Sequence, residues 1–223
     1  MGFYVILFAT LGLDAVLLGS LVWAFYSPRF ERQRIQPGAA IKVPLAKRAQ
    51  HAVVSSAISL ATVLGATYFL RAFLLHDRST SLVVQALQAG AILLVYDFVY
   101  YWMHRAMHIK KVMRFVHGVH HRATNPSALE SFFLHPIELL SGLALLLGST
   151  ALVGPVHENS FILAFFVYST LNILIHSGLV FGHWMLRPID WLTKKHHVHH
   201  HDDFARNYAS LTPLPDLLFG TSQ

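Results

Sequence analysis

Residues 82–108 read LVVQALQAGAILLVYDFVYYWMHRAMH, an apolar stretch that ends in two histidines four residues apart. A helix needs about 20 apolar residues to cross the roughly 30 Å hydrocarbon core of a bilayer. We therefore predict a membrane-spanning helix over residues 82–103. Because residues four apart share one face of a helix, His104 and His108 are expected to lie side by side just beyond the span.

Four further stretches are similarly apolar, namely 3–26, 52–75, 137–153 and 160–182. The stretch 137–153 is short, so it is either a full span or one half of a re-entrant hairpin with 160–182. The stretch 3–26 lacks a basic leading segment and a small-residue cleavage site, which favours a retained span over a signal peptide. Apolar residues make up 54% of the chain and charged residues only 13%, which argues against a soluble protein. The predicted fold is an all-α integral membrane protein, a single domain over 1–223 with four to five membrane helices.

The basic residues gather on one predicted side of the membrane. Fifteen of the 17 Lys and Arg residues follow the first, third or fifth span, and only Arg71 and Arg78 lie elsewhere. Because positive charges concentrate in cytoplasmic loops, we expect the N-terminus outside and the C-terminus in the cytoplasm. A bacterial inner membrane and the endoplasmic reticulum both fit this topology. The net charge of +6 therefore indicates a lipid bilayer as partner, and no nucleic acid is expected.

Histidine is the main polar chemistry of the chain, with 16 His against 11 Asp and Glu and no Cys. After His104 and His108 comes the HxxHH cluster of residues 117–121, and residues 196–201 contain the same spacing twice. Histidines three and four apart can reach one metal ion, and imidazole binds iron, zinc, copper and nickel. Eight or more clustered histidines exceed the shell of one tetrahedral ion, so two metals are hypothesised in a cytoplasmic histidine-rich helical cap. Thiolate zinc sites and iron–sulfur clusters are excluded because there is no cysteine.

Two points of geometry follow from the spacing. His117 lies nine residues after His108, half a turn out of phase on a straight helix, so either the helix breaks or the clusters meet from different directions. His176 lies six residues from the inner end of the predicted span 160–182, about 9 Å deep. All of these groups can converge at the cytoplasmic membrane boundary, where a lipid substrate and cytoplasmic electrons both have access.

The order HxxxH, HxxHH and HxxHH between hydrophobic spans resembles the fatty acid hydroxylase/sterol desaturase superfamily, the membrane-bound histidine-box oxygenases. The flanks are also similar, including DFVYYWMHR at 97–105, HPIE at 135–138, NILIH at 172–176 and NYA at 207–209. The resemblance covers about 90–221, the predicted catalytic region, whereas 1–80 is expected to act mainly as a membrane anchor. It implies a non-haem di-iron oxidoreductase, a hydroxylase or desaturase, that uses O2 to oxidise an unactivated C–H bond of a sterol, fatty acyl or related lipid.

Carried over to this chain, the resemblance implies a specific set of metal ligands. They are His104, His108, His117, His120, His121, His176 and one frame of the third cluster. The favoured frame is His197, His200 and His201, because five residues then separate its last histidine from Asn207, as in relatives. The frame His196, His199 and His200 stays open. The implied cofactors are two iron ions, with zinc as a possible occupant of a purified sample, and O2 is the co-substrate. No haem or flavin motif is present, so a separate electron-donor protein is expected.

Several nearby residues are candidates for direct ligation or for support of a ligand. His135 fits either role, and Asn172 fits ligation through water or a hydrogen bond within its span. Asp97 is expected to hold a box histidine by a hydrogen bond, and Asn207 is a further candidate for support. Asp14, inside the first span, is expected to pack or to form a hydrogen bond.

Two other classes of function are alternatives to the oxygenase. A divalent-metal transporter, or a non-catalytic metal-binding membrane protein, is the main alternative, but a transporter needs polar residues along its spans. A membrane b-type cytochrome needs paired histidines inside its spans. Here the spans are mostly apolar and the histidines gather at one face, which favours the oxygenase.

Overall fold

The structure is a computed structural model that describes residues 2–39, 43–201 and 203–223. Five long helices form a bundle: α1 (Gly2–Tyr26), α2 (Leu45–Phe69), α4 (Leu82–Met107), α6 (Pro136–Val153) and α7 (Glu158–Ile175). Each is long and apolar enough to cross a membrane, which confirms the predicted all-α membrane fold. The fourth and fifth apolar stretches are two separate helices, each of 18 residues.

Two helix ends differ from the sequence prediction. The second span begins at Leu45 instead of residue 52, directly after Pro44. Its first turns carry Lys47 and Arg48, which are good helix formers although they are not apolar. The fifth helix ends at Ile175, and Gly178 follows with a φ of 66° that ordinary residues rarely adopt. His176 therefore caps the end of the helix instead of lying six residues inside it.

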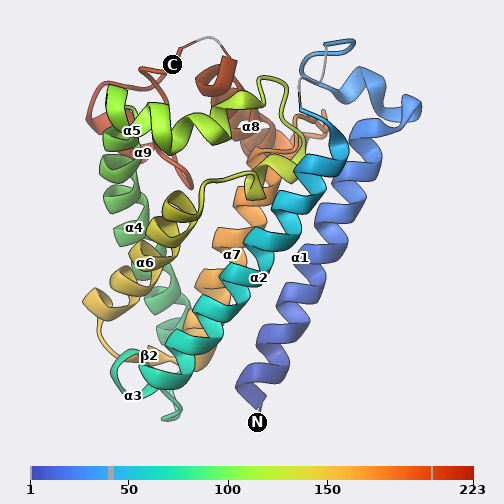
Figure 1. Cartoon of the computed structure of the whole chain (residues 1–223). Coiled ribbons are helices and arrows are strands. Elements are labelled where there is room, and N and C mark those ends of the chain that lie inside the picture. Colours follow the sequence, from blue (N-terminus) through green and yellow to red (C-terminus); the bar gives the residue numbers. More distant parts are fainter. Residues whose placement is uncertain (1, 40–42, 202) are drawn as a thin grey trace.

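Shorter elements close the two ends of the bundle. The end where α1 begins carries α3 (Arg71–Leu74) and a parallel pair of two-residue strands, β1 (Leu75–His76) and β2 (Val156–His157). The opposite end carries α8 (Arg187–His201) and α9 (Leu214–Leu218), as Figure 1 shows. The remaining short elements are α5 (Lys110–Phe115) and the 3-10 turns η1 (Pro28–Gln33), η2 (His117–Arg122), η3 (Ala128–Phe132) and η4 (Trp184–Leu186).

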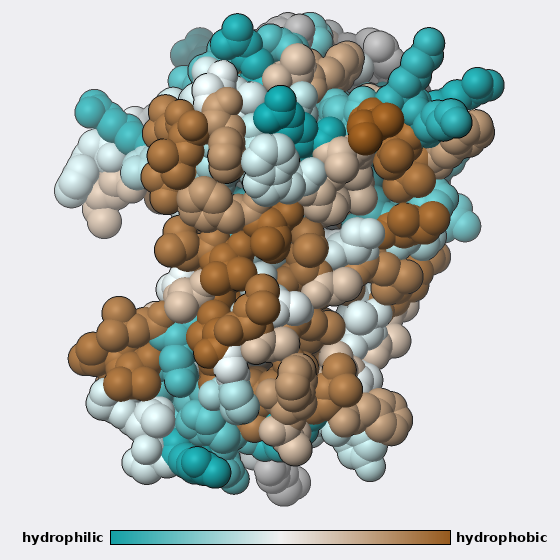
Figure 2. Space-filling model, turned by 90° about the vertical axis from the view of Figure 1, so that its left-hand side faces the viewer, coloured by the Kyte–Doolittle hydropathy of each residue, from teal (hydrophilic) through white to brown (hydrophobic). Residues whose placement is uncertain are grey.

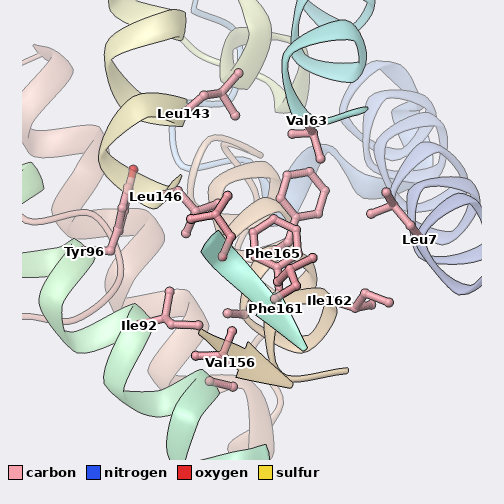
Figure 3. Packing of buried hydrophobic residues seen from close by; sticks show 14 of the residues in the cluster. Leu7, Val63, Ile92, Tyr96, Leu143, Leu146, Val156, Phe161, Ile162 and Phe165 are labelled. Carbon is pink, nitrogen blue, oxygen red and sulfur yellow. The ribbon is translucent and has the colours of Figure 1, made fainter. Parts of the chain in front are cut away.

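The apolar core lies between the long helices. In the bundle, α4 packs on α6 and α7, while α1 packs on α7 and α2 packs on α6. Leu7, Ile92, Leu146 and Phe161 are buried at the meeting of these helices (Figure 3). The outer face is also apolar, and residues such as Phe69 and Leu82 are each 80% exposed. Figure 2 shows hydrophobic side chains across the middle of one face, with hydrophilic ones towards both ends. Such a surface suits lipid contact.

A buried cation ties the N-terminal helices to the histidine-bearing end. Arg48 of α2 is only 1% exposed and forms an ion pair with Glu130 of η3. The Arg48 guanidinium also donates hydrogen bonds to the hydroxyls of Tyr26 and Ser127. A buried guanidinium needs such partners, because an unpaired buried charge is strongly destabilising. This contact fixes the segment that leads from η2 to α6.

Candidate metal centre

Nine histidines assemble into two adjacent groups at the end of the bundle. The first histidine group comprises His104, His108, His117, His121 and His199, and the second comprises His120, His176, His196 and His200. Within each group, one ring nitrogen from every member lies within 4.8 Å of those of the others. All except the half-buried His108 are buried. The described residues therefore form two candidate metal sites, in keeping with the hypothesis of two metals.

Each HxxHH cluster contributes to both groups, and helical geometry explains why. Successive residues on an α-helix point about 100° apart, so neighbouring histidines diverge. In α8, His199 joins the first group and His200 joins the second. In η2, His121 joins the first group and His120 joins the second. The two clusters therefore bridge the two sites instead of filling one each.

The helix that carries His104 ends before His117, which explains how His108 and His117 can face each other despite their spacing. The helix α4 ends at Met107, His108 caps it, and α5 and η2 follow with new directions. Gly118 permits the tight return into η2, because a Cβ there would lie 2.5 Å from the Met113 carbonyl oxygen. The clusters thus meet from different directions, one of the two alternatives that the spacing leaves open.

In the third cluster, the structure groups the alternative frame, and of the favoured frame only His200 lies in a group. His196, His199 and His200 enter the two groups, whereas His197 and His201 enter neither. These two lie one turn apart on α8, and their rings stack with centroids 5.9 Å apart. They occupy a different face of the helix from His196 and His200, and the sequence alone does not show which face meets the other clusters.

The hydrogen bonds of the first group leave nitrogen lone pairs facing each other. The Nδ1 of His104 lies 2.7 Å from the Tyr208 carbonyl oxygen, which can only accept, so Nδ1 donates and Nε2 keeps its lone pair. The Nδ1 of His117 likewise donates to the Glu138 carboxylate at 2.8 Å. Yet the Nε2 atoms of His104 and His117 are 3.1 Å apart. Two lone pairs cannot form a hydrogen bond, so this arrangement suits a cation between them.

In the second group, the ring nitrogens also face one another, and His176 has its lone pair directed inward. His176 donates from Nδ1 to the carbonyl oxygen of Asn172 at 2.7 Å, and its Nε2 lies 2.9 Å from Nε2 of His196 and 3.2 Å from Nε2 of His120. Among the described residues, neither ring nitrogen of the buried His200 has a hydrogen-bond partner. In the first group, Nδ1 of His199 donates to the Arg206 carbonyl at 2.6 Å. In the part of the chain that the structure describes, the buried Nε2 of His199 has no hydrogen-bond partner. Buried polar atoms without partners are costly unless something binds them.

The electrostatics of the site favour neutral imidazoles. Burial lowers the pKa of His108 to about 3 and the pKa of His176 to about 4, and it lowers the pKa of His200 well below its ordinary value. Neutral imidazole is the form that binds metals, and an acceptor on the far nitrogen orients the ring. The nine histidines therefore fit two transition-metal ions of the kinds that imidazole binds.

The other sequence candidates lie around the groups and not within them. His135 caps the start of α6, where its Nδ1 accepts from the Ile137 amide. The side chain of Asn172 donates to the Ser131 carbonyl, at 3.4 Å, and only its backbone oxygen holds His176. Asn207, with a φ of 58°, donates from its side chain to the Lys195 carbonyl.

Asp97 differs from its predicted role. Its carboxylate accepts hydrogen bonds from the backbone amides of Ser210, Leu211 and Thr212 and from the Thr212 hydroxyl, and not from a box histidine. The expected contact was wrong because the C-terminal segment folds back over α4 and reaches this carboxylate first. Asp97 thus secures the segment whose Tyr208 and Arg206 carbonyls orient two histidines of the first group.

Glu138 is the functional residue that sequence reasoning did not single out. It lies in the first turn of α6, is 6% exposed and holds His117. The available signal was its place in the HPIE element, together with the rarity of a carboxylate at the end of an apolar span.

Comparisons with known proteins agree with this chemistry. The sequence model of the fatty acid hydroxylase family matches residues 89–221. A very-long-chain aldehyde decarbonylase of Oryza sativa subsp. indica is 33% identical over 138 residues, covering 57% of this chain and 49% of the relative. Methylsterol monooxygenase 1 of Rattus norvegicus is 30% identical over 133 residues, covering 56% and 43%. The chain thus aligns with about half of the length of these curated relatives or less. No solved structure matches the chain.

Proposed function

Because the chain belongs to the fatty acid hydroxylase family, we propose that it is an O2-dependent di-iron enzyme that hydroxylates or desaturates a membrane lipid. The observation that carries the proposal is the pair of buried histidine groups whose ring nitrogens converge, with nitrogen lone pairs facing each other in the first group. Two bound iron ions would supply the redox chemistry that activates O2. The nine histidines of the two groups are the proposed ligands, and Glu138 and the three backbone carbonyls orient them.

A cavity beside the second group supports a lipid substrate. It has a volume of about 270 Å³ and lies between the long helices. His120 and His176 line one part of it, while apolar residues such as Leu143 and Phe165 line another. Largely apolar pockets with few polar groups are typical ligand sites. An alkyl or sterol-like chain inside it would be held near the metal site and shielded from water.

The position of the histidines supports an enzyme over a transporter. The two groups lie at one end of the bundle, beyond or at the ends of the long helices, and not along a path through them. We infer that this end faces the cytoplasm, because most basic residues lie there. It is therefore accessible to a separate electron-donor protein.

Metal analysis tests this proposal directly. We expect about two irons per chain in anaerobically purified wild-type protein and a sharp fall in His120→Ala. His197→Ala is the matched control, because His197 lies in a histidine cluster but outside both groups. Wild-type protein with a reductant and O2 is expected to yield oxidised lipids by mass spectrometry. No bound transition metal after iron-replete expression would contradict the proposal.

A further inference from the structure

A buried carboxylate, Asp14, lies in the wall of the cavity that His120 and His176 also line. Asp14 is the central residue of α1, about 18 Å from either helix end at 1.5 Å per residue, and is only 6% exposed. A carboxylate at this depth in a membrane is expensive and is a functional candidate by default. Among the described residues, Asp14 has no ion-pair partner.

The hydrogen bonds of Asp14 leave room for a further donor. Its carboxylate accepts from the hydroxyls of Ser169 and Thr170 on α7, the latter at 2.8 Å. An ionised carboxylate offers about four acceptor positions, so two remain available. Asp14 therefore forms the hydrogen bonds that the sequence predicts, but these bonds do not occupy all acceptor positions of its carboxylate.

Other polar groups line the same cavity, among them Glu138 and Asn172 near the histidines. Ser56 and Ser59 of α2 contribute to its wall together with Asp14 and Ser169. Within the described part of the chain, neither α2 hydroxyl forms a hydrogen bond. The helices α1, α2 and α7 thus bring hydroxyls and the Asp14 carboxylate to a cavity that His120, His176 and Glu138 also line.

The spacing along α7 gives the distance between this polar part and the metal site. Ser169, which contacts Asp14, lies seven residues before His176, or about 10 Å along the helix. A ligand that reaches both ends therefore needs a polar group about 10 Å from the carbon presented to the histidines. Moreover, α1 and α2 lie before the matched residues 89–221, so Asp14, Ser56 and Ser59 are supplied by the part of the chain outside the family match, while Ser169 lies within it.

We propose that Asp14, with Ser59, Ser56 and Ser169, forms a subsite that binds a hydroxyl group of the lipid, about 10 Å from the carbon to be oxidised. The lipid hydroxyl donates to the Asp14 carboxylate and accepts from a serine hydroxyl. The substrate class is accordingly a lipid alcohol with an extended apolar body. This inference rests on the proposed function, since it names the substrate of the same cavity.

Binding of matched probes tests the subsite without relying on catalysis. Purified full-length protein in detergent micelles is equilibrated with isotopically labelled 1-dodecanol or dodecane, and the bound probe per chain is measured. At the same micelle concentration, we expect the ratio of bound 1-dodecanol to bound dodecane to be about tenfold or more higher in wild type than in Asp14→Ala. A hydrogen bond to a charged group is worth that much. Asp14→Asn, which keeps the size and one acceptor oxygen, is expected to show an intermediate preference.

The control is Ser20→Ala, which alters an exposed hydroxyl on α1 outside the cavity and should bind like wild type. Equal binding of both probes by wild type overturns the subsite, even if the Asp14 variants fail to fold. Stronger binding of dodecylamine than of 1-dodecanol overturns the assignment of a hydroxyl ligand. A preference for the alcohol without lipid oxidation would support the subsite and contradict the proposed function. Lipid oxidation without that preference would support the proposed function and contradict the subsite.

Discussion

At the scale of single residues, the hydrogen bond at Nδ1 of a histidine ring decides where its Nε2 points. His104, His117, His176 and His199 each have Nδ1 held by an oxygen acceptor, which directs Nε2 inward. Three of these acceptors are backbone carbonyls, so only Glu138 can be changed by simple substitution. Partners of this kind typically account for 10-fold to 100-fold in metal affinity.

We expect Glu138→Gln to weaken metal binding by roughly 10-fold to 100-fold while the protein stays folded, because the neutral amide holds His117 less strongly. Metal retention during titration with a chelator measures the change. Glu31→Gln serves as the control, since Glu31 is an exposed carboxylate of η1. Unchanged retention in Glu138→Gln would show that this hydrogen bond does not support the metal.

At the scale of an element, α8 acts as a bridge because its histidines point in three directions. His199 faces the first group, His200 faces the second, and His197 stacks with His201 elsewhere. Consecutive histidines on one helix thus have separable roles, which single substitutions can resolve.

Each of His199→Ala and His200→Ala is expected to lower the metal content from about two ions to about one per chain, while His197→Ala retains two. The reason is that each substitution removes one ligand from one group only. Elemental analysis of the three purified variants provides the comparison. Loss of metal in His197→Ala with full retention in His199→Ala would restore the frame His197, His200 and His201.

At the scale of the whole molecule, five long helices place the start of α1 and the C-terminal segment at opposite ends of the bundle (Figure 1). The chain contains no cysteine, so single introduced cysteines can report their side of the membrane without background labelling.

In intact cells or sealed right-side-out vesicles, a membrane-impermeant maleimide is expected to label Arg78→Cys and to spare Lys110→Cys. Arg78 lies in the connection before α4, and Lys110 is the first residue of α5, just beyond the other end of α4. Permeabilisation should make both cysteines reactive, which controls for burial. Labelling of Lys110→Cys alone before permeabilisation would invert the proposed orientation.

The buried imidazoles also set a pH dependence for the metal-free protein. Burial lowers the pKa of His176 from 6.5 to about 4, and unfolding returns it to the ordinary value. The unfolded chain therefore binds more protons between these values, so stability falls as the pH is lowered from about 6.5 to about 4. Thermal unfolding of the metal-free protein in detergent should show this fall, and His176→Asn should reduce its slope. A transition temperature that is constant or rises on acidification would contradict the burial of neutral imidazoles.

What the sequence by itself determined was the membrane fold and the chemistry. Apolar runs of sufficient length and i, i+4 spacing are local properties, and therefore the five helices, the histidine clusters and the family could be predicted from residues such as His104 and His108. Tertiary structure alone decided which histidines meet. The frame of α8, the role of Asp97 and the contact of Glu138 with His117 depend on how separate segments pack and on which helix face turns inward. No local pattern encodes that choice, because His196 and His197 have the same side chain and nearly the same sequence environment but point about 100° apart.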